Sequence, residues 1–404
     1  MPPIRIAGPV TVMVALSTAV AAPDGPSSRP DEGSVAEQAF MVNPVQLTFA
    51  EQFAKAGEAY FNEDSSWIIF QAVVAPPPGE TPSPHYAMYV ARVQRDEAGH
   101  VTGLDEPVLL SAPDSANTCG WFHPTDPGVV LFGSTRVPPA EQDAPGYSRD
   151  RDRYTWQFPN EMNVCTRTVQ AIVEANVEDS EVRAELLARA DVEMAIPLWT
   201  QDGYCAEASW SPDGRCILYT GVDPETGDGD IHVRILETGE SRTLVTAAGY
   251  DGGPFFSPDG KFICYRSDRR GDSALQLFVS ALAFDEDGLP AGIQGEFALT
   301  DNEHVNWAPY WHPSGAFLVY ATSEVGHHNY EVFAMPFDAR YPERRHTPVR
   351  ITHADGFDGL PVFSPDGTLM MWTAQRGDDL TNKGRPSSQL WLAEVVGWGH
   401  AIAR

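Results

Sequence analysis

The chain has 404 residues, of which 42% are hydrophobic, and its 56 acidic residues against 27 Lys and Arg give a formal net charge of −29. Because Lys and Arg drive binding to phosphates, this balance argues against a nucleic acid or an anionic membrane as the partner. No stretch beyond the N-terminal segment approaches the ~20 apolar residues of a membrane span. The excess of acids is explained by solubility, with a cation or a basic partner as the alternative.

The first 21 residues resemble an export signal. Arg5 supplies a positive charge, Val10–Val20 is mostly apolar, and Ala19-Val20-Ala21 fits the small-x-small rule for cleavage. The pattern predicts a signal peptide over residues 1–21 and a periplasmic or secreted protein. Residues 22–42 are rich in Pro, Ser, Gly and Asp, and we expect them to form a disordered linker.

From about residue 43 the chain repeats one pattern, in which an aromatic residue and a turn of the Ser-Pro-Asp-Gly type precede an alternating apolar run. The copies follow one another at intervals of roughly 45 to 55 residues, a period typical of propellers and other arrays. Four clear copies are Trp210–Gly214, Phe256–Gly260, Trp311–Gly315 and Phe363–Gly367, and two weaker ones are Tyr60–Ser66 and Trp121–Gly128.

The chemistry of the turn predicts the local structure. Pro presets φ for a tight turn, Asp tolerates the next position, and Gly accepts the positive φ that follows. Each copy is therefore a β-hairpin, and two further strands per interval make a four-stranded antiparallel blade. We predict an all-β fold, a six-bladed β-propeller over residues 43–396, with a C-terminal tail over 397–404.

The order of strands indicates how the ring closes. The last recognisable strand, near Leu390, is the third of its blade, so the sixth blade lacks its fourth strand. Residues 44–48 end like the other fourth strands, and we predict that they pair with the C-terminal blade. Such closure removes the exposed strand edges that promote aggregation.

An insertion over residues 137–195 separates the second and third blades. Val137–Phe158 is a Pro-rich, charged surface loop, and Gln170–Ala195 has apolar residues at helical spacing. We predict one helical insertion over about 170–195, packed on the rim of the propeller. It is either a partner-binding element or a decoration without a function.

The five cysteines show no metal-type Cys-x-x-Cys spacing, and Cys216 and Cys264 lie inside apolar strands, where a small buried hydrophobe is expected. Cys119 and Cys205 precede inner strands of neighbouring blades. A disulfide between them remains open, because its geometry cannot be derived from sequence.

Candidate ligand-binding residues lie just before the inner strands, which line the central channel of a propeller. Seven residues upstream of each turn proline are Asn117, Cys205, Asp251, Asn306 and Asp358, with Glu207 two residues further along its blade. We expect the channel mouth at Asn117, Glu207, Asp251, Asn306 and Asp358. Such oxygens could hold calcium, bind a polar ligand or a peptide end, or simply cap the strands.

Motifs for catalysis are absent from the sequence. There is no Gly-x-Ser-x-Gly elbow, no His-Glu-x-x-His and no phosphate-binding glycine loop. His327 and His328 are adjacent, so in an extended strand they point to opposite sides and do not share a metal. We therefore expect a non-catalytic binding module. The alternative is a polysaccharide lyase or glycoside hydrolase that uses carboxylates at the channel mouth.

The repeats resemble those of the TolB-like propeller family, also described as WD40-like PD40 repeats. Asp251–Lys261 and Asn306–Pro313 carry the resemblance most clearly. It covers the propeller only, without the α/β domain that precedes the propeller in the family's namesake. The resemblance implies a periplasmic protein that binds a protein or a cell-envelope polymer, because the namesake docks a peptidoglycan-associated lipoprotein.

Overall fold

The Ser-Pro-Asp-Gly turns form the hairpins for a local chemical reason. In the third blade, Ser211 Oγ donates to Asp213 Oδ1 at 2.7 Å and accepts the backbone N–H of Cys216 at 2.9 Å. Gly214 follows with a φ of 71°. The turns at Ser257 and Ser364 repeat both hydrogen bonds. The acid of each turn therefore orders the hairpin and has no other role.

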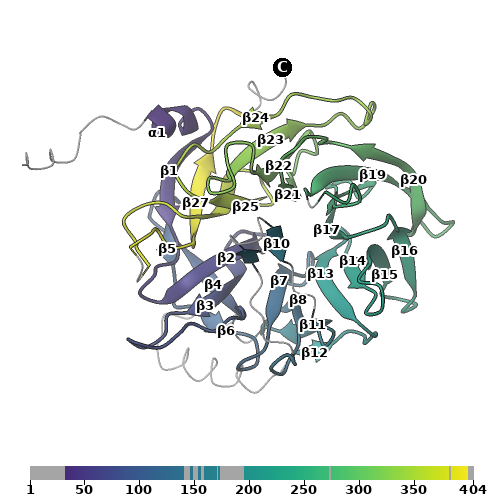
Figure 1. The fold of residues 1–404 in the computed structure, drawn as a ribbon, viewed down its shortest axis with the longest axis horizontal. Coiled ribbons are helices and arrows are strands. Elements are labelled where there is room, and N and C mark those ends of the chain that lie inside the picture. The colour runs from purple at the N-terminus through teal and green to yellow at the C-terminus, as the bar shows by residue number, and fades with distance from the viewer. Residues whose placement is uncertain are drawn as a thin grey trace, which may run out of the picture.

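The computed structural model describes residues 32–140, 146–148, 153–155, 159–170, 172, 195–272, 274–381 and 384–398. They contain six blades arranged in a ring in chain order (Figure 1). The all-β six-bladed propeller predicted from the repeats is confirmed. Among these residues, no helix is long and apolar enough to cross a membrane. The predicted signal peptide over 1–21 lies outside the described residues.

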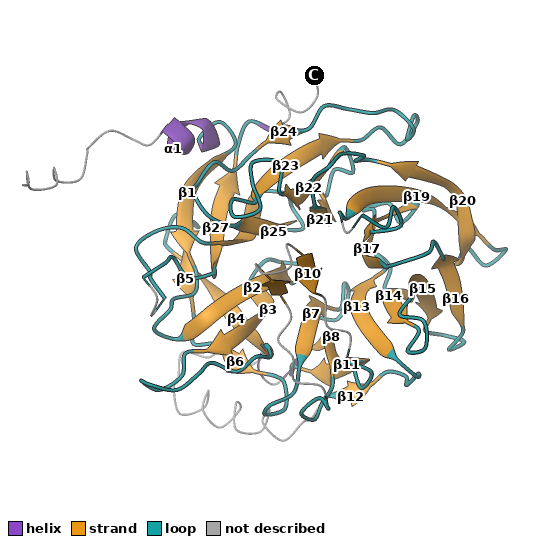
Figure 2. Ribbon diagram, in the orientation of Figure 1, coloured by secondary structure: helices purple, strands orange, loops and turns teal. Residues whose placement is uncertain are grey.

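Each blade runs from an inner strand at the channel to an outer strand at the rim (Figure 2). Blade one has β2 (Phe53–Phe61), β3 (Trp67–Val74), β4 (Ala87–Arg95) and an outer edge split into β5 (Val101–Leu104) and β6 (Val108–Leu109). Blade two has β7 (Asn117–Phe122), β8 (Val129–Ser134), β11 (Asn163–Thr168) and β12 (Ile196–Pro197). Blade three has β13 (Tyr204–Trp210), β14 (Cys216–Val222), β15 (Gly229–Ile235) and β16 (Ser241–Val245).

Blades four to six follow the same order. Blade four has β17 (Asp251–Phe256), β18 (Phe262–Ser267), β19 (Gln276–Phe284) and β20 (Pro290–Ala298). Blade five has β21 (Asn306–Trp311), β22 (Phe317–Thr322), β23 (Glu331–Pro336) and β24 (Val349–Arg350). Blade six has β25 (Asp358–Phe363), β26 (Leu369–Ala374), β27 (Gln389–Val395) and β1 (Met41–Gln46).

The N-terminal strand closes the ring as predicted. β1 is the fourth strand of blade six and pairs antiparallel with β27, with Val45 opposite Leu392. Beyond the strand, Leu47 N–H donates to the carbonyl of Leu390 at 2.8 Å. The pairing therefore includes the predicted residues 44–48 and starts earlier, at Met41.

Both ends of the propeller are more ordered than composition suggested. Helix α1 (Glu32–Glu37) lies within the segment 22–42 that we expected to be a disordered linker. The Glu37 carboxylate accepts two hydrogen bonds from Arg376 in blade six, at 3.0 and 3.1 Å. Trp398, in the predicted tail, is buried and donates to the Phe40 carbonyl at 2.6 Å. These contacts hold the two ends against the last blade, which a low-complexity composition does not reveal.

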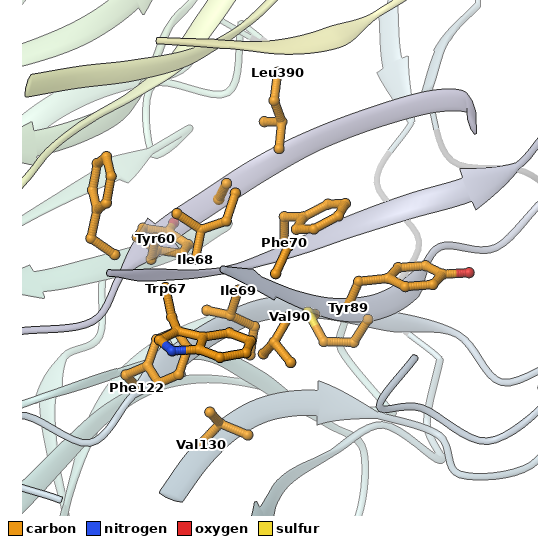
Figure 3. Packing of buried hydrophobic residues seen from close by; sticks show 14 of the residues in the cluster. Tyr60, Trp67, Ile68, Ile69, Phe70, Tyr89, Val90, Phe122, Val130 and Leu390 are labelled. Carbon is orange, nitrogen blue, oxygen red and sulfur yellow. The ribbon is translucent and has the colours of Figure 1, made fainter. Parts of the chain in front are cut away.

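The core lies between the faces of adjacent blades. In blade one, Ile68 and Phe70 point toward Leu390 of blade six, whereas Trp67 and Ile69 point toward Phe122 and Val130 of blade two (Figure 3). β3 is consequently buried on both faces, which explains its continuous apolar sequence.

The structure places the predicted insertion within blade two, between β8 and β11 and between β11 and β12, and not between blades two and three; it is described only in part. β9 (Gly146–Ser148) and β10 (Arg153–Thr155) pair with each other as a separate two-stranded sheet. Apart from residues 170, 172 and 195, the predicted helix over 170–195 lies outside the described residues.

Candidate functional site

Four of the five predicted site residues begin an inner strand, each in its own blade. Asn117, Asp251, Asn306 and Asp358 are the first residues of β7, β17, β21 and β25, and all are buried. Each of these side chains is hydrogen-bonded or ion-paired within its own neighbourhood, so their convergence on one ligand stays a prediction. The four residues occupy the same position in their blades, and each holds the loop before its strand in place by hydrogen bonds or an ion pair.

The two aspartates are paired with arginines. Asp251 Oδ1 accepts from Arg269 at 2.9 Å, and its other oxygen accepts the N–H of Ala247 at 3.0 Å. Asp358 forms an ion pair with Arg376 and also accepts from Trp372 Nε1 at 3.2 Å. Burial raises the pKa of both carboxyls, and the arginines oppose that rise.

The two asparagines bond to nearby loop atoms. Asn117 Nδ2 donates to the Tyr86 carbonyl at 2.9 Å and to the Ser115 carbonyl at 3.0 Å. Asn306 Nδ2 donates to Asn302 Oδ1 at 2.8 Å and to the His304 carbonyl at 3.1 Å. Both side chains therefore act as loop fasteners, as the strand-capping interpretation predicted.

A β-bulge two residues further along supplies the groups that face the channel. All six inner strands have a register shift here, and the extra residue adopts a positive φ between 44° and 60°. A bulge of this kind redirects one side chain out of the sheet's alternation. The six bulge residues, all of which line the channel, are Glu58, Cys119, Glu207, Gly253, Ala308 and Leu360.

Sequence analysis found only Glu207 of these six. In five blades the bulge lies five residues before the turn proline rather than seven, and that column reads Cys119, Glu207, Gly253, Ala308 and Leu360. The alternation rule fails at a bulge, so nothing in the pattern of residue types pointed to this column. Glu58 was missed because its repeat has no proline to align on.

Aromatic rings close the channel below the bulges. Tyr60 and Trp121 stack with ring centroids 4.8 Å apart, and Phe255 and Tyr310 meet edge-on at 5.5 Å. Each ring lies two residues after a bulge residue in its strand. The remaining void is about 20 Å³, which holds a water or two. The propeller is therefore plugged, and a chain cannot pass through it.

Glu207 lies at the centre of a buried polar cluster between blades three and four. Its Oε2 accepts from Tyr250 Oη at 2.6 Å, from Gly253 N–H at 2.6 Å and from Arg266 Nη2 at 3.2 Å. Its Oε1 accepts from Tyr204 Oη at 3.3 Å. The carboxylates and phenols around Arg266 raise the pKa of its guanidinium against the effect of burial. Glu207 is thus fixed by its hydrogen bonds and its ion pair and acts as a structural group.

Glu58 is the other acid at the bulges. Its Oε1 accepts from Cys119 Sγ at 2.9 Å and from Tyr60 Oη at 3.3 Å. Burial raises the pKa of the Glu58 carboxyl, and burial beside Glu58 also raises the pKa of the Cys119 thiol well above its usual range. Since the nucleophilic form of cysteine is the thiolate, Cys119 is not an activated nucleophile.

Above the bulges, where the inner strands begin, lies a cavity of about 380 Å³, which we call the mouth cavity. This volume is within the range of small-ligand sites. Its polar lining includes Lys55, Glu58, Gln71, His85, Asn117, Glu207 and Arg266. Its apolar lining includes Met162, Trp307, Phe357 and Leu360. Asn117 and Glu207 are therefore at the predicted mouth, whereas Asp251, Asn306 and Asp358 are not part of its lining.

The suggested calcium site finds no support in the donor set. Across the described parts of the chain, no group of three or more His, Cys, Asp or Glu side chains is placed to hold a metal ion. Glu207, Asp251 and Asp358 each have an arginine partner instead of an open oxygen.

The five cysteines are unpaired, so the open question of a Cys119–Cys205 disulfide is answered in the negative. The bulge directs Cys119 into the channel, whereas Cys205 is fully buried among Leu131, Trp210 and Ile217. Burial raises the pKa of Cys205 to about 12 and that of Cys165 to about 11.

No family model matches the sequence. An uncharacterized protein of Agrobacterium fabrum is 28% identical over 129 residues, which are 32% of this chain and 38% of that protein. In architecture, the chain is a six-bladed β-propeller, as its repeats predicted.

Solved structures with a similar fold include two described as TolB. The one from Agrobacterium tumefaciens has a TM-score of 0.48 at 14% identity and covers 84% of this chain and 90% of its own. The one from Acinetobacter baumannii has a TM-score of 0.49 at 16% identity and covers 83% of this chain and 65% of its own. A puromycin-hydrolyzing peptidase of Mycobacterium tuberculosis has a TM-score of 0.42 at 14% identity, covering 81% and 45%.

Proposed function

We propose that this protein is an exported, non-catalytic binding module that receives part of a protein or of a cell-envelope polymer in its mouth cavity. One observation carries the proposal: the cavity lies at the face where the inner strands begin and is closed below by the aromatic plug. A blind cavity of about 380 Å³ accepts the end or a side group of a partner.

The lining also supports binding rather than catalysis. A general acid or base needs an oxygen free to reach the substrate. Glu207 has its oxygens engaged by Tyr250, Gly253, Arg266 and Tyr204. The remaining acid of the cavity, Glu58, already accepts from the Cys119 thiol and the Tyr60 hydroxyl. The lyase or hydrolase alternative therefore lacks the pair of available carboxylates that it requires.

The location of the partner follows from the N-terminal pattern. Residues 1–21 have the features of a signal peptide, so the proposed site of action is the periplasm or the exterior. The net charge of −29 favours a neutral or basic partner surface around the cavity over nucleic acid.

The test is capture of a partner from the envelope fraction of the source organism by immobilised protein, comparing Phe357→Ala with Tyr341→Ala. Phe357 lines the mouth cavity, whereas Tyr341 is 55% exposed in the segment that follows β23, at the opposite end of the blade. The proposal predicts that only Phe357→Ala loses the captured protein or polymer, with the melting temperatures of both variants checked first. Equal capture by both variants would place the binding surface elsewhere.

A further inference from the structure

Two polar groups of the mouth cavity lack a complementary polar partner among the described residues: the Lys55 ammonium has no carboxylate, and Gln71 Oε1 has no donor. Lys55 on β2 places its ammonium 4.1 Å from the centre of the Tyr86 ring, and no described carboxylate lies within ion-pair distance of it. Gln71 on β3 is 8% exposed, and its Oε1 is buried without a hydrogen-bond donor in the described part of the chain. A buried acceptor without a donor costs about 1–3 kcal/mol, so such groups usually have a role.

The strand register places these two groups side by side. Lys55 is opposite Val73, and Gly57 is opposite Gln71, so Lys55 and Gln71 are diagonal neighbours on one face of the β2–β3 ladder. The Cα atoms of such neighbours lie about 7–8 Å apart. Gly57 carries no side chain on this face, and Thr373 of blade six occupies the space there, with its Oγ1 2.8 Å from where a Cβ of residue 57 would be.

Lys55 and Gln71 are complemented by different groups of a ligand. An ammonium that already lies on an aromatic ring is complemented by an anion, and the buried amide oxygen requires a donor. His85 beside Lys55 cannot supply the anion, because an imidazole is either neutral or cationic. Burial and the charge of Lys55 lower its pKa, which favours the neutral form. A ligand that fits both carries a negative group with an N–H close by.

The opposite wall of the cavity is apolar. Trp307, Phe357 and Leu360, from blades five and six, line it. Trp307 and Phe357 have ring centroids 6.1 Å apart, so they form one aromatic surface. An apolar side chain attached next to the anionic group would be removed from water against this wall.

We infer that the mouth cavity captures the carboxy-terminal residue of a peptide, with its free carboxylate on Lys55, its amide N–H on Gln71 Oε1, and an apolar side chain against Trp307, Phe357 and Leu360. The inference rests on the proposed function and specifies its ligand. A chain end is required because the aromatic plug stops a peptide from threading further. Chain termini held through their charged end are a known mode of peptide recognition.

The experiment uses a synthetic library of hexapeptides with the last two positions randomised, prepared once as free acids and once as C-terminal amides. Each set is passed over the immobilised full chain, and retained peptides are quantified by mass spectrometry. Free acids ending in an apolar residue should be retained at least tenfold more than their amides, the range expected for one charge-assisted hydrogen bond.

Variants connect the result to the named groups. Lys55→Met should remove the preference for the free acid, and Gln71→Leu should lower retention about threefold to tenfold, the worth of a neutral hydrogen bond. Gln71→Leu should not lower the melting temperature, because it removes an acceptor without a donor. The control is Lys261→Met, since Lys261 is an exposed lysine of the turn after β17, paired with Asp259 at 3.6 Å.

The outcomes distinguish a failure of the carboxylate inference from a failure of the proposed function. Equal retention of acids and amides, or an unchanged preference in Lys55→Met, would overturn the carboxylate inference and leave the cavity as a peptide site. No retention of either set would overturn both the inference and the peptide form of the proposed function. Equal binding of the matching N-acetyl amino acids would show that the ligand is a free small acid, which also contradicts the inference.

Discussion

Arg266 on β18 reaches across to Glu207 on β13, with Nη2 3.2 Å from Oε2, so that one ion pair joins blades three and four at the channel. Both side chains are largely buried. Tyr250 completes the contact, because its hydroxyl lies 2.6 Å from the carboxylate and 2.8 Å from Arg266 Nη2. These three side chains face the channel and hold blades three and four together.

Replacing one member of this pair should destabilise the ring. Arg266→Met leaves the Glu207 carboxylate buried without its cation, a change that costs about 3–5 kcal/mol. The free energy of unfolding in urea measures the loss. The double variant Arg266→Met with Glu207→Gln should recover part of it. Arg340→Met, at an exposed pair with Asp338, should leave the midpoint unchanged. A single variant as stable as wild type would contradict the structural role of the pair.

Gly253 should tolerate no side chain. Its φ is +60°, and an added Cβ would lie 2.1 Å from Arg266 Nη1. Gly253→Ala therefore combines a left-handed alanine, at about 1–2 kcal/mol, with overpacking of about 1–3 kcal/mol. Chemical denaturation should show both costs. Gly292→Ala is the matched control, because nothing lies within 4 Å of its Cβ position. Equal stability of the two variants would mean that the bulge can relax.

Glu331 should make stability depend on pH. Its carboxylate is buried against Arg350 at 2.7 Å and Thr352 at 2.5 Å, and burial raises its pKa from 4.5 to about 7. The folded state thus binds the proton more tightly than the unfolded state. This contribution is fully present below pH 4.5 and is lost as pH rises through 7, to a total of about 3 kcal/mol.

The check is the unfolding free energy of wild type and Glu331→Gln measured from pH 4.5 to pH 8.5. Wild type should lose stability relative to the variant across this window, because glutamine does not titrate. Glu343→Gln, at an exposed position, should follow wild type throughout. Parallel curves for wild type and Glu331→Gln would show that the Glu331 carboxyl has an ordinary pKa.

Calcium should not stabilise the propeller. Asp251 and Asp358, once expected to form an oxygen ring, are held by Arg269 and Arg376 instead. A ligand that binds only the folded state raises the melting temperature. We expect the same melting temperature in EDTA and in millimolar calcium, with magnesium as the control for ionic strength. A calcium-specific rise that disappears in Asp251→Asn would contradict this assignment.

The ion pairs of Asp251 and Asp358 with arginines change what we expect from replacing them. As residues of the expected channel mouth, both carboxylates would be needed for binding and not for stability. Because each neutralises a partly buried arginine, Asp251→Asn and Asp358→Asn should instead lower stability and leave the mouth cavity intact. Binding lost in the folded double variant would restore the original interpretation.

The sequence predicted the ring better than the site. The Ser-Pro-Asp-Gly turns depend only on local backbone preferences. The hairpin at each turn could therefore be predicted from the sequence alone. The closing strand was predictable because one blade lacked a strand. The site depends on a bulge that shifts Glu58, Cys119 and Glu207 out of alternation, and no residue type marks that bulge in the sequence. The arginine partners of Asp251 and Asp358 each lie 18 residues further along the chain, just beyond the second strand of the same blade, a repeated spacing that the turn-based alignment did not consider.

The most direct test of the account is position-specific cross-linking with a benzophenone side chain at residue 357 or at residue 341. Position 357 lines the mouth cavity, and position 341 is exposed beyond the other end of the blade. The account predicts that, in the envelope of living cells, irradiation produces a covalent partner adduct from position 357 and none from position 341. An adduct from position 341 alone would contradict the claim that the mouth cavity is the binding site.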